Sequence, residues 1–522
     1  MNNDGARSGS ALHLPSHKLA RNSAWNLIAL FATIAVHFIT VPVVIGRIGL
    51  GEFGNAGLVL ALWAPLFLVG TVTGQALTRE LGIRVGDHDP DGLRRLTESA
   101  SLLWVLSTVL GWLALALAGP ALLSRLVGDG GAAHWRWDIA VAGLGWAAQQ
   151  GSLMLQGAST AYQSYRIVAL VTFVTAGVTI ATILLWSRAL PSADGYLAGL
   201  TAGYVFGLLL WLAVARATGS ASFIMPRMHR TELHSLFSFG KWQGLAQLTG
   251  TLANQIDRYV LGAVASPIIV GQYNAAKRPQ EAAYSVASKL AEVLFPYFVS
   301  AAKADAARQA KLYLLASWAV MTCGAMVLGP AISLADPIMR IWLGPEVANG
   351  GAQLMRTLVL AGLLGCGSNV FAFYLMGLGK NAPFALTAVL YSCLAIVLSI
   401  LIIRHWGGYA AGAGLVIASM MRMLVSLGIL RHSILRNIRL GDLAMSSISP
   451  LLVGAAAAYL WRLAPVIGGI HSWAGVMLAY LGISLSIGAG VSLVTATTPF
   501  GRSAIVWMAG VLQRSVMSRG VA

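Results

Sequence analysis

Apolar residues along the chain come in long blocks that are separated by short polar turns. A helix of about 20 residues, rising about 1.5 Å per residue, crosses the hydrocarbon core of a bilayer. The blocks are rich in Leu, Ala, Val and Gly and lack the short alternation of membrane strands, so helices must satisfy the buried backbone. The pattern predicts an all-α polytopic membrane protein with about 14 transmembrane helices. These are expected at residues 22–45, 54–78, 96–118, 137–159, 167–187, 195–215, 239–262, 269–299, 312–335, 354–377, 383–403, 409–430, 444–463 and 472–495.

The seventh predicted helix repeats the polar pattern of the first. The matched positions are Trp25 with Trp242, Asn26 with Gln243, Thr33 with Gly250, His37 with Asn254 and Thr40 with Asp257. Both copies enter from the same side of the membrane, which indicates a parallel pseudo-repeat, although chance similarity between apolar helices is an alternative. We therefore predict two six-helix lobes plus two C-terminal helices. The N-terminal lobe spans residues 21–216 and the C-terminal lobe spans 236–431, and a cytoplasmic linker, 217–235, joins them. The two additional helices lie in 444–495. The segments 1–20 and 496–522 are predicted to be cytoplasmic tails.

A polar stripe on residues 239–262 suggests a path for a polar species. At about 100° per residue, one face collects Gln243, Gln247, Asn254, Asp257 and Arg258. An aspartate and an arginine facing lipid cost several kcal/mol, so this face is expected to line a wet cavity or a protein contact. The matching stripe on the first helix contains Asn26 and His37; the histidine either relays protons or donates a hydrogen bond.

The next helix, predicted at 269–299, carries the densest charge of any spanning segment. One face is expected to hold Lys277, Glu281, Tyr284, Ser288 and Glu292, with Arg278 and Lys289 at its margin. Pairing of Lys277 with Glu281 and of Lys289 with Glu292 would leave Arg278 as the surplus cation. Together with Arg258 these groups predict a positively biased cavity for a phosphate or diphosphate. The alternative is that the charges neutralise one another and brace the two helices.

These patterns give one set of candidate substrate-binding residues. The set is Asn26, His37, Gln243, Gln247, Asn254, Asp257, Arg258, Lys277, Arg278, Glu281 and Lys289. Two further arginines, Arg356 and Arg422, are expected near helix ends, where a long side chain can reach the membrane surface; contact with the substrate is the alternative.

The net charge and the missing motifs exclude several classes of function. The net charge is +17, but the cations concentrate in alternate loops between apolar blocks, which is typical of membrane orientation and not of nucleic-acid binding. This bias predicts a multi-pass membrane protein with both termini cytoplasmic. Walker, GxSxG and HExxH sequences are missing, and the three cysteines form no CxxC pair. We expect no enzyme activity, no metal and no cofactor.

A family resemblance is carried by residues 21–54 (RNSAWNLIALFATIAVHFITVPVVIGRIGLGEFG) and 239–276 (FGKWQGLAQLTGTLANQIDRYVLGAVASPIIVGQYNAA). It is strongest at Asp257-Arg258 and Val270-Gly271-Gln272-Tyr273. The chain resembles bacterial polysaccharide transporters, the O-antigen and exopolysaccharide flippases of the multidrug/oligosaccharidyl-lipid/polysaccharide exporter superfamily. The resemblance implies that a polyprenyl-diphosphate-linked oligosaccharide moves from the inner to the outer leaflet by alternating access, with its sugar in a cationic cavity. It also implies contact with membrane lipids and with polymerase or glycosyltransferase partners.

Other readings stay open at the level of sequence. Family members commonly have 12 helices, and the two extra helices after Ala444 resemble those of 14-helix lipid II flippases. A multidrug cation antiporter of the same superfamily would depend on a membrane-embedded carboxylate, for which Asp257 and Glu281 are candidates. A scaffold or a membrane glycosyltransferase is a third alternative.

Overall fold

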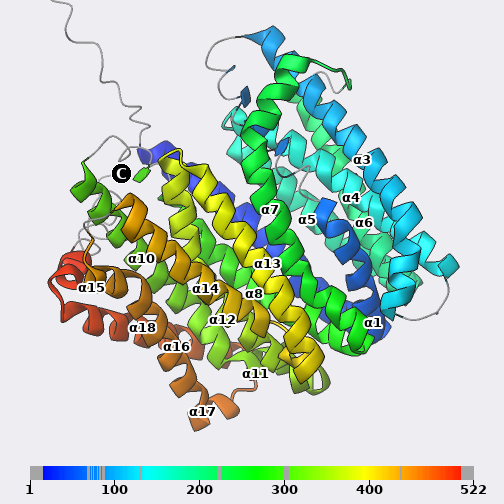
Figure 1. Cartoon of the computed structure of the whole chain (residues 1–522). Coiled ribbons are helices and arrows are strands. Elements are labelled where there is room, and N and C mark those ends of the chain that lie inside the picture. Colours follow the sequence, from blue (N-terminus) through cyan, green and yellow to red (C-terminus); the bar gives the residue numbers. More distant parts are fainter. Residues whose placement is uncertain are drawn as a thin grey trace, which may run out of the picture. The chain divides into compact units, whose positions relative to one another are not determined.

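The computed structural model describes residues 16–66, 71, 73–74, 76–78, 80–81, 84, 89–127, 132–219, 225–294, 297–298, 305–435 and 438–506. Helices make up the described chain, and no strand occurs within it (Figure 1). Ten helical segments of the described residues are long and apolar enough to cross a membrane. The prediction of an all-α polytopic membrane protein is therefore confirmed, whereas the number of 14 spans stays a prediction.

Every predicted span overlaps a helix. In the first half of the chain these are α1 (Ser16–Trp63), followed by η1 (Ala64–Leu66), then α3 (Pro90–Val127), α4 (Ala132–Ala161), α5 (Tyr165–Ala189) and α6 (Ala193–Thr218). The middle contributes α7 (Arg230–Val264), α8 (Pro267–Val293), α10 (Ala306–Ser333), α11 (Ala335–Leu343) and α12 (Pro345–Gly377). The last part contributes α13 (Asn381–Trp406), η2 (Gly408–Ala410), α14 (Ala413–Ile429), η3 (Leu430–Ile434), α15 (Leu440–Leu443), η4 (Ala444–Ile448), α16 (Ser449–Arg462), α17 (Pro465–Gly468) and α18 (Trp473–Ala496).

The chain divides into two compact units. Unit 1 comprises residues 1–47, 69–117 and 136–240, and unit 2 comprises 48–68, 118–135 and 241–522. Unit 2 thus takes in two segments that the sequence-based division placed in the N-terminal lobe. The lobe bounds and the pseudo-repeat stay predictions.

Unit 1 has its core between α3, α4, α6 and the segment before α3. Leu77, Leu96, Met154 and Trp211 are among the buried side chains of this cluster. Helices α5 and α6 approach closely because glycines of α6 face β-branched residues of α5: a Cβ on Gly203 would lie 2.7 Å from the Thr179 Cα. Small residues at such crossings let helix backbones come together in a membrane.

Unit 2 is built around α12, which packs against α8, α10 and α14. Aromatic side chains fill one end of this core, where the Tyr374 ring meets Phe298 at 5.5 Å and Tyr313 at 5.1 Å, edge to face in both cases. The two C-terminal membrane helices lie along α10 (Figure 1). Their hydrogen bonds include Ser333 Oγ to the Ala458 carbonyl at 2.8 Å. These helices therefore belong to the packed body of unit 2.

The second limb of α1, after Gly49, packs tightly on the start of α8. A Cβ placed on Gly54 would lie 2.1 Å from the Pro267 carbonyl oxygen, and one on Gly57 would lie 1.9 Å from the Asn274 amide nitrogen. The Tyr259 hydroxyl of α7 donates to the Ala61 carbonyl at 2.6 Å. These contacts hold the polar halves of α7 and α8 in place within unit 2.

Candidate functional site

An intramembrane cavity of about 380 Å³ lies among helices α7, α8, α12, α13 and α14 of unit 2. Small residues on two helices leave the space open: Gly250 on α7, and Gly362 and Gly365 on α12. A Cβ on Gly362 would lie 3.1 Å from the Gln280 side chain, so a larger residue would displace the polar wall opposite. The polar side chains in the lining are Thr251, Asn254, Gln255, Lys277, Gln280, Glu281, Tyr284, Ser368, Tyr391, Ser419 and Arg422.

Arg422 supplies a cation to this cavity from the middle of α14. Its guanidinium carbon lies 5.3 Å from the centre of the Tyr391 ring and 5.9 Å from that of Phe384. Its Nε is buried and has no hydrogen-bond partner among the described residues, and no carboxylate of the described chain pairs with it. A buried charge without a counter-ion is unfavourable unless a ligand supplies one. Arg422 is thus equipped to receive an anion.

Helix α8 provides the opposite, mixed-charge wall. Residues Lys277, Glu281 and Tyr284 all line the cavity, as their spacing along one helix face predicts. Lys277 Nζ donates to the Asn254 carbonyl at 2.6 Å and lies 5.6 Å from the centre of the Tyr273 ring. The Tyr284 hydroxyl donates to Asn369 Oδ1 at 3.2 Å. The lysine and the tyrosine are therefore fixed in orientation by neighbouring helices.

Arg278 differs from the surplus cation expected from the sequence. Its Nη1 lies 3.1 Å from Glu281 Oε2, so it forms an ion pair with the carboxylate that the sequence assigned to Lys277. Arg278 follows Lys277 directly, so it lies on another face of α8, and it is not among the residues that line the cavity. Its pairing makes Arg278 a counter-charge to Glu281.

Asp257 and Arg258 are buried beside the cavity without lining it. The Tyr273 hydroxyl donates to Asp257 Oδ2 at 3.0 Å. Arg258 Nε donates to Asn274 Oδ1 at 2.5 Å, and its Nη1 donates to Gln255 Oε1. Arg258 therefore lies behind Gln255, which itself lines the cavity, and holds α7 against α8.

The remaining candidates lie elsewhere. Asn26 is exposed and His37 is half-buried on the first limb of α1, in unit 1. Gln247 on α7 and Lys289 on α8 are half-buried in unit 2 and are not among the residues that line the cavity. The side chain of Gln243 lies outside the described residues.

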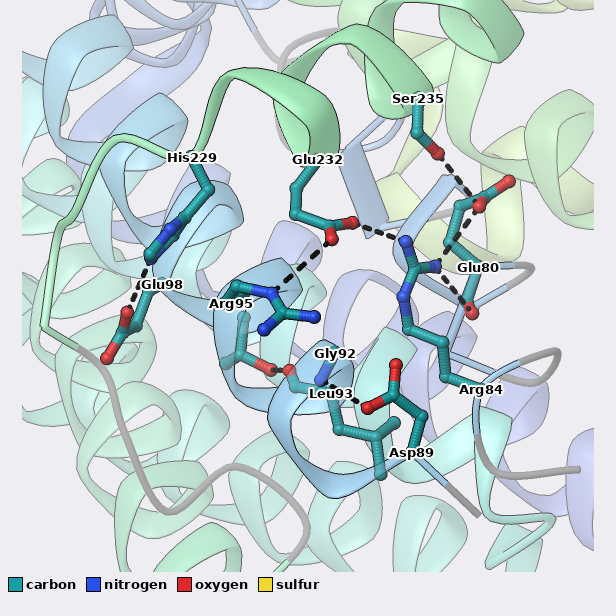
Figure 2. A network of polar contacts seen from close by, with 11 residues as sticks. Glu80, Arg84, Asp89, Gly92, Leu93, Arg95, Glu98, His229, Glu232 and Ser235 are labelled. Atoms are coloured by element: carbon teal, nitrogen blue, oxygen red, sulfur yellow. Dashed lines mark hydrogen bonds and ion pairs between the residues drawn. The ribbon is translucent and has the colours of Figure 1, made fainter. Parts of the chain in front are cut away.

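A second cluster of charges lies in unit 1, at the start of α7 (Figure 2). Arg84 pairs with Glu80 on its own segment at 3.2 Å and with Glu232 of α7, while Arg95 of α3 reaches Glu232 at 3.8 Å. Nearby, His229 Nε2 lies 2.8 Å from Glu98 Oε2. The three glutamates are buried, so these pairs tie the segment 229–235 to α3 and to the segment before it.

Sequence reasoning missed Tyr391 and placed substrate contact by Arg422 second to a position near a helix end. Helix α14 runs from Ala413 to Ile429 and places Arg422 well inside the helix. A usable signal was available in the sequence, because Tyr391 and Arg422 fall in the interior of consecutive apolar spans, where polar side chains are rare and functional.

Solved structures with the same fold are membrane transporters. The lipid II flippase MurJ in an inward closed conformation is 12% identical over 90% of this chain and 98% of that chain, with a TM-score of 0.68. An inward-facing multidrug resistance transporter of the MATE family is 14% identical over 78% of this chain and 95% of that chain, with a TM-score of 0.65. A MOP superfamily transporter from Pyrococcus furiosus is 13% identical over 81% and 97% of the two chains, with a TM-score of 0.57.

The chain therefore has the fold of the MOP superfamily of transporters. It belongs to the family described as polysaccharide biosynthesis protein, whose model matches residues 19–302. The comparison with curated proteins gives no match. The family resemblance found in the sequence is thereby confirmed.

Proposed function

We propose that this protein is a flippase that moves a polyprenyl-diphosphate-linked oligosaccharide from the inner to the outer leaflet of the bacterial cytoplasmic membrane. The product serves the synthesis of a cell-surface polysaccharide: an exopolysaccharide, an O-antigen or a capsule. Transport proceeds by alternating access, and both termini stay in the cytoplasm. A polymerase or a glycosyltransferase handles the lipid-linked sugar before or after it is moved.

The observation that carries this proposal is Arg422, a cation inside the membrane-spanning bundle that has no carboxylate partner among the described residues. A phosphate or a sugar carboxylate fits the planar fork of a guanidinium better than any cationic drug does. The family, described as polysaccharide biosynthesis protein, supports the same reading.

The other cavity groups suit a sugar or phosphate head group. The cavity volume of about 380 Å³ lies within the range of small-molecule sites, about 300–1,000 Å³, and suits a part of an oligosaccharide head group. Tyr284 and Tyr391 offer ring faces to a sugar, while Gln280 and Asn254 offer amides to its hydroxyls. Lys277 adds a second cation on the far wall.

A multidrug cation antiporter is the second candidate function, and lipid II transport is a variant of the first. Glu281 in the cavity and the buried Asp257 behind it favour a cation. The same fold serves a multidrug transporter and a lipid II flippase. The Pyrococcus furiosus transporter is described as having a binding pocket of reverse polarity, which suggests a different function for it. The charge of the pocket is therefore the property that we use to distinguish these candidate functions.

The test replaces Arg422 in the organism that makes the polymer. Arg422→Ala should abolish surface polymer and cause the lipid-linked oligosaccharide to accumulate, because a charge-assisted pair contributes about 1.5–3 kcal/mol, or about ten- to one-hundred-fold in affinity. Arg422→Lys keeps the charge and should retain part of the export. Surface polymer and lipid-linked sugars are measured together with the amount of protein in the membrane.

The matched control is Arg404→Ala, at the exposed end of α13 and outside the cavity lining. This variant should export normally. Normal polymer in Arg422→Ala cells with normal protein levels would refute the proposal. Loss of drug resistance with normal polymer would instead establish the antiporter.

A further inference from the structure

A second pocket of unit 2 lies at one end of the C-terminal helices. Its volume is about 760 Å³, and it is enclosed by the first turns of α10, by the segment around α15 and by the residues that follow α18. The lining is Ala306, Ala307, Ala310, Lys311, Leu314, Leu315, Ile434, Leu435, Ile438, Arg439, Asp442, Pro499, Phe500 and Ser503. None of these residues belongs to the cavity around Arg422.

The pocket lies at the boundary of the membrane. The spanning segments Ala306–Ser333 and Leu440–Arg462 begin beside it, and Trp473–Ala496 ends beside it. Leu314 and Leu315 lie two turns further along α10 and are buried. The pocket therefore runs from the helix ends toward the apolar interior, on the side that the loop charges predict to be cytoplasmic.

Charged side chains lie at the rim of the pocket, and apolar side chains lie at its inner end. Lys311 and Arg439 are exposed at the rim, where Asp442 is the acidic group in the lining. Among the described residues no ion pair joins either cation to Asp442 or to another carboxylate. The floor consists of Leu314, Leu435 and Phe500 and is apolar. A ligand that matches both ends has an anionic head and a hydrocarbon tail.

We propose that this pocket binds one anionic glycerophospholipid of the cytoplasmic leaflet. The phosphodiester meets Lys311 and Arg439, and an acyl chain lies along Leu314, Leu435 and Phe500. A zwitterionic lipid has the same phosphodiester but also a cationic group in its head, which the cationic rim repels, so it lacks the net negative charge that the rim complements. Residues 507–522 of the chain itself contain Arg514 and Arg519 and no acidic side chain, so their charge has the same sign as the rim.

Phe500 and Ser503 line the pocket and follow α18 directly. The two C-terminal helices would therefore help to bind the lipid. It joins the end of α18 to the start of α10 through a ligand that is present only in an anionic membrane. This inference does not depend on what the protein transports.

The test measures lipid retained by the full-length protein. Purified protein in detergent is given equal amounts of phosphatidylglycerol and phosphatidylcholine, and bound lipid is counted by native mass spectrometry. Wild-type protein should retain phosphatidylglycerol in preference. The variant Lys311→Gln/Arg439→Gln should lose that preference, by about five-fold for each cation removed. Arg308→Gln is the matched control, since Arg308 is exposed on the same helix but does not line the pocket.

Four results would overturn the proposal. The first is equal retention of the two lipids by wild-type protein, and the second is unchanged retention of phosphatidylglycerol in the double variant. The third is a gain of phosphatidylglycerol binding in a chain ending at residue 506, which would make the C-terminal segment the occupant. Displacement of the lipid by inorganic phosphate alone would likewise assign the rim to free phosphate and contradict the lipid proposal.

Discussion

The guanidinium of Arg422 lies over the ring of Tyr391, with 5.3 Å between the Arg422 Cζ and the ring centre. The two residues come from α14 and α13, and both line the intramembrane cavity. An arginine that stacks on an aromatic face keeps its N–H groups free at the edge of the plane, where they can bind an oxyanion. The tyrosine therefore orients the charge on which the proposed function depends.

Removing the Tyr391 ring should weaken transport. A cation–π contact contributes about 0.5–2 kcal/mol, so Tyr391→Ala should reduce export by about two- to thirty-fold. Tyr391→Phe keeps the aromatic face and should export nearly normally. Surface polymer is normalised to protein in the membrane; export by Tyr391→Ala equal to that of Tyr391→Phe would show that stacking is dispensable.

Lys277 should affect binding more than stability. It is buried, and its Nζ donates to the Asn254 carbonyl at 2.6 Å, near the like charges of Arg258 and Arg278 and the opposite charges of Glu281 and Asp257. Lys277→Met fills a similar volume and removes the cost of burying the charge, which offsets the lost attraction to the two carboxylates, so the melting temperature should not fall. Export should fall by about ten-fold or more because one cation of the cavity is lost. If the melting temperature instead fell strongly while each folded molecule exported as much as the wild-type protein, Lys277 would have a structural role.

The contact of Gly57 with Asn274 should be intolerant of a methyl group. A Cβ at Gly57 would lie 1.9 Å from the Asn274 amide nitrogen, and Asn274 in turn accepts from Arg258. Gly57→Ala should destabilise the protein by about 1–3 kcal/mol, because Asn274 and Arg258 must shift. Gly51→Ala, on the same limb of α1 with nothing within 4 Å of its Cβ, is the matched control and should be neutral. Thermal unfolding in detergent distinguishes the two; equal melting temperatures would contradict the packing argument.

The pair Arg84–Glu232 should hold the linker segment to unit 1 (Figure 2). The two side chains are 17% and 8% exposed, and breaking a largely buried pair costs about 3–5 kcal/mol. Glu232→Gln should therefore expose the bonds after Arg227 and Arg230 to trypsin. Arg84→Met/Glu232→Gln should be less destabilised than the sum of the two single variants, because the contact between Arg84 and Glu232 can be lost only once. Strict additivity would mean that the two residues do not stabilise the segment through each other.

The fold was predictable because the membrane restricts what the chain can do. Long apolar blocks admit only helices, and every predicted interval overlaps one. The spacing of Lys277, Glu281 and Tyr284 also predicted their common wall, since residues four and three apart share a helix face. Both features depend on residues that are close together in the sequence, so they can be predicted from the sequence alone.

The site was predictable only in part, because it depends on which helices meet. Asp257 and Arg258 share the polar stripe of α7, yet they contact Tyr273 and Asn274 of α8 and do not line the cavity. The polar stripe shows which side of α7 carries the polar residues, but it does not show which helix packs against that side. Arg422 shows the converse: the only polar residues that share its face of α14 are the serines Ser419 and Ser426, and it reaches the cavity because α13 and α14 place it opposite α8.

Helix α1 passes from unit 1 into unit 2 at residues 47 and 48, and its backbone leaves the helical conformation at Gly49, with φ 81° and ψ 166°. Only glycine adopts this conformation readily, and no atom lies within 4 Å of the position of a Cβ there. One of the several crossings of the chain between its two units therefore lies beside a residue whose backbone conformation suits glycine alone. Any side chain at position 49 would strain the backbone, so the change of direction within α1 depends on the identity of this one residue.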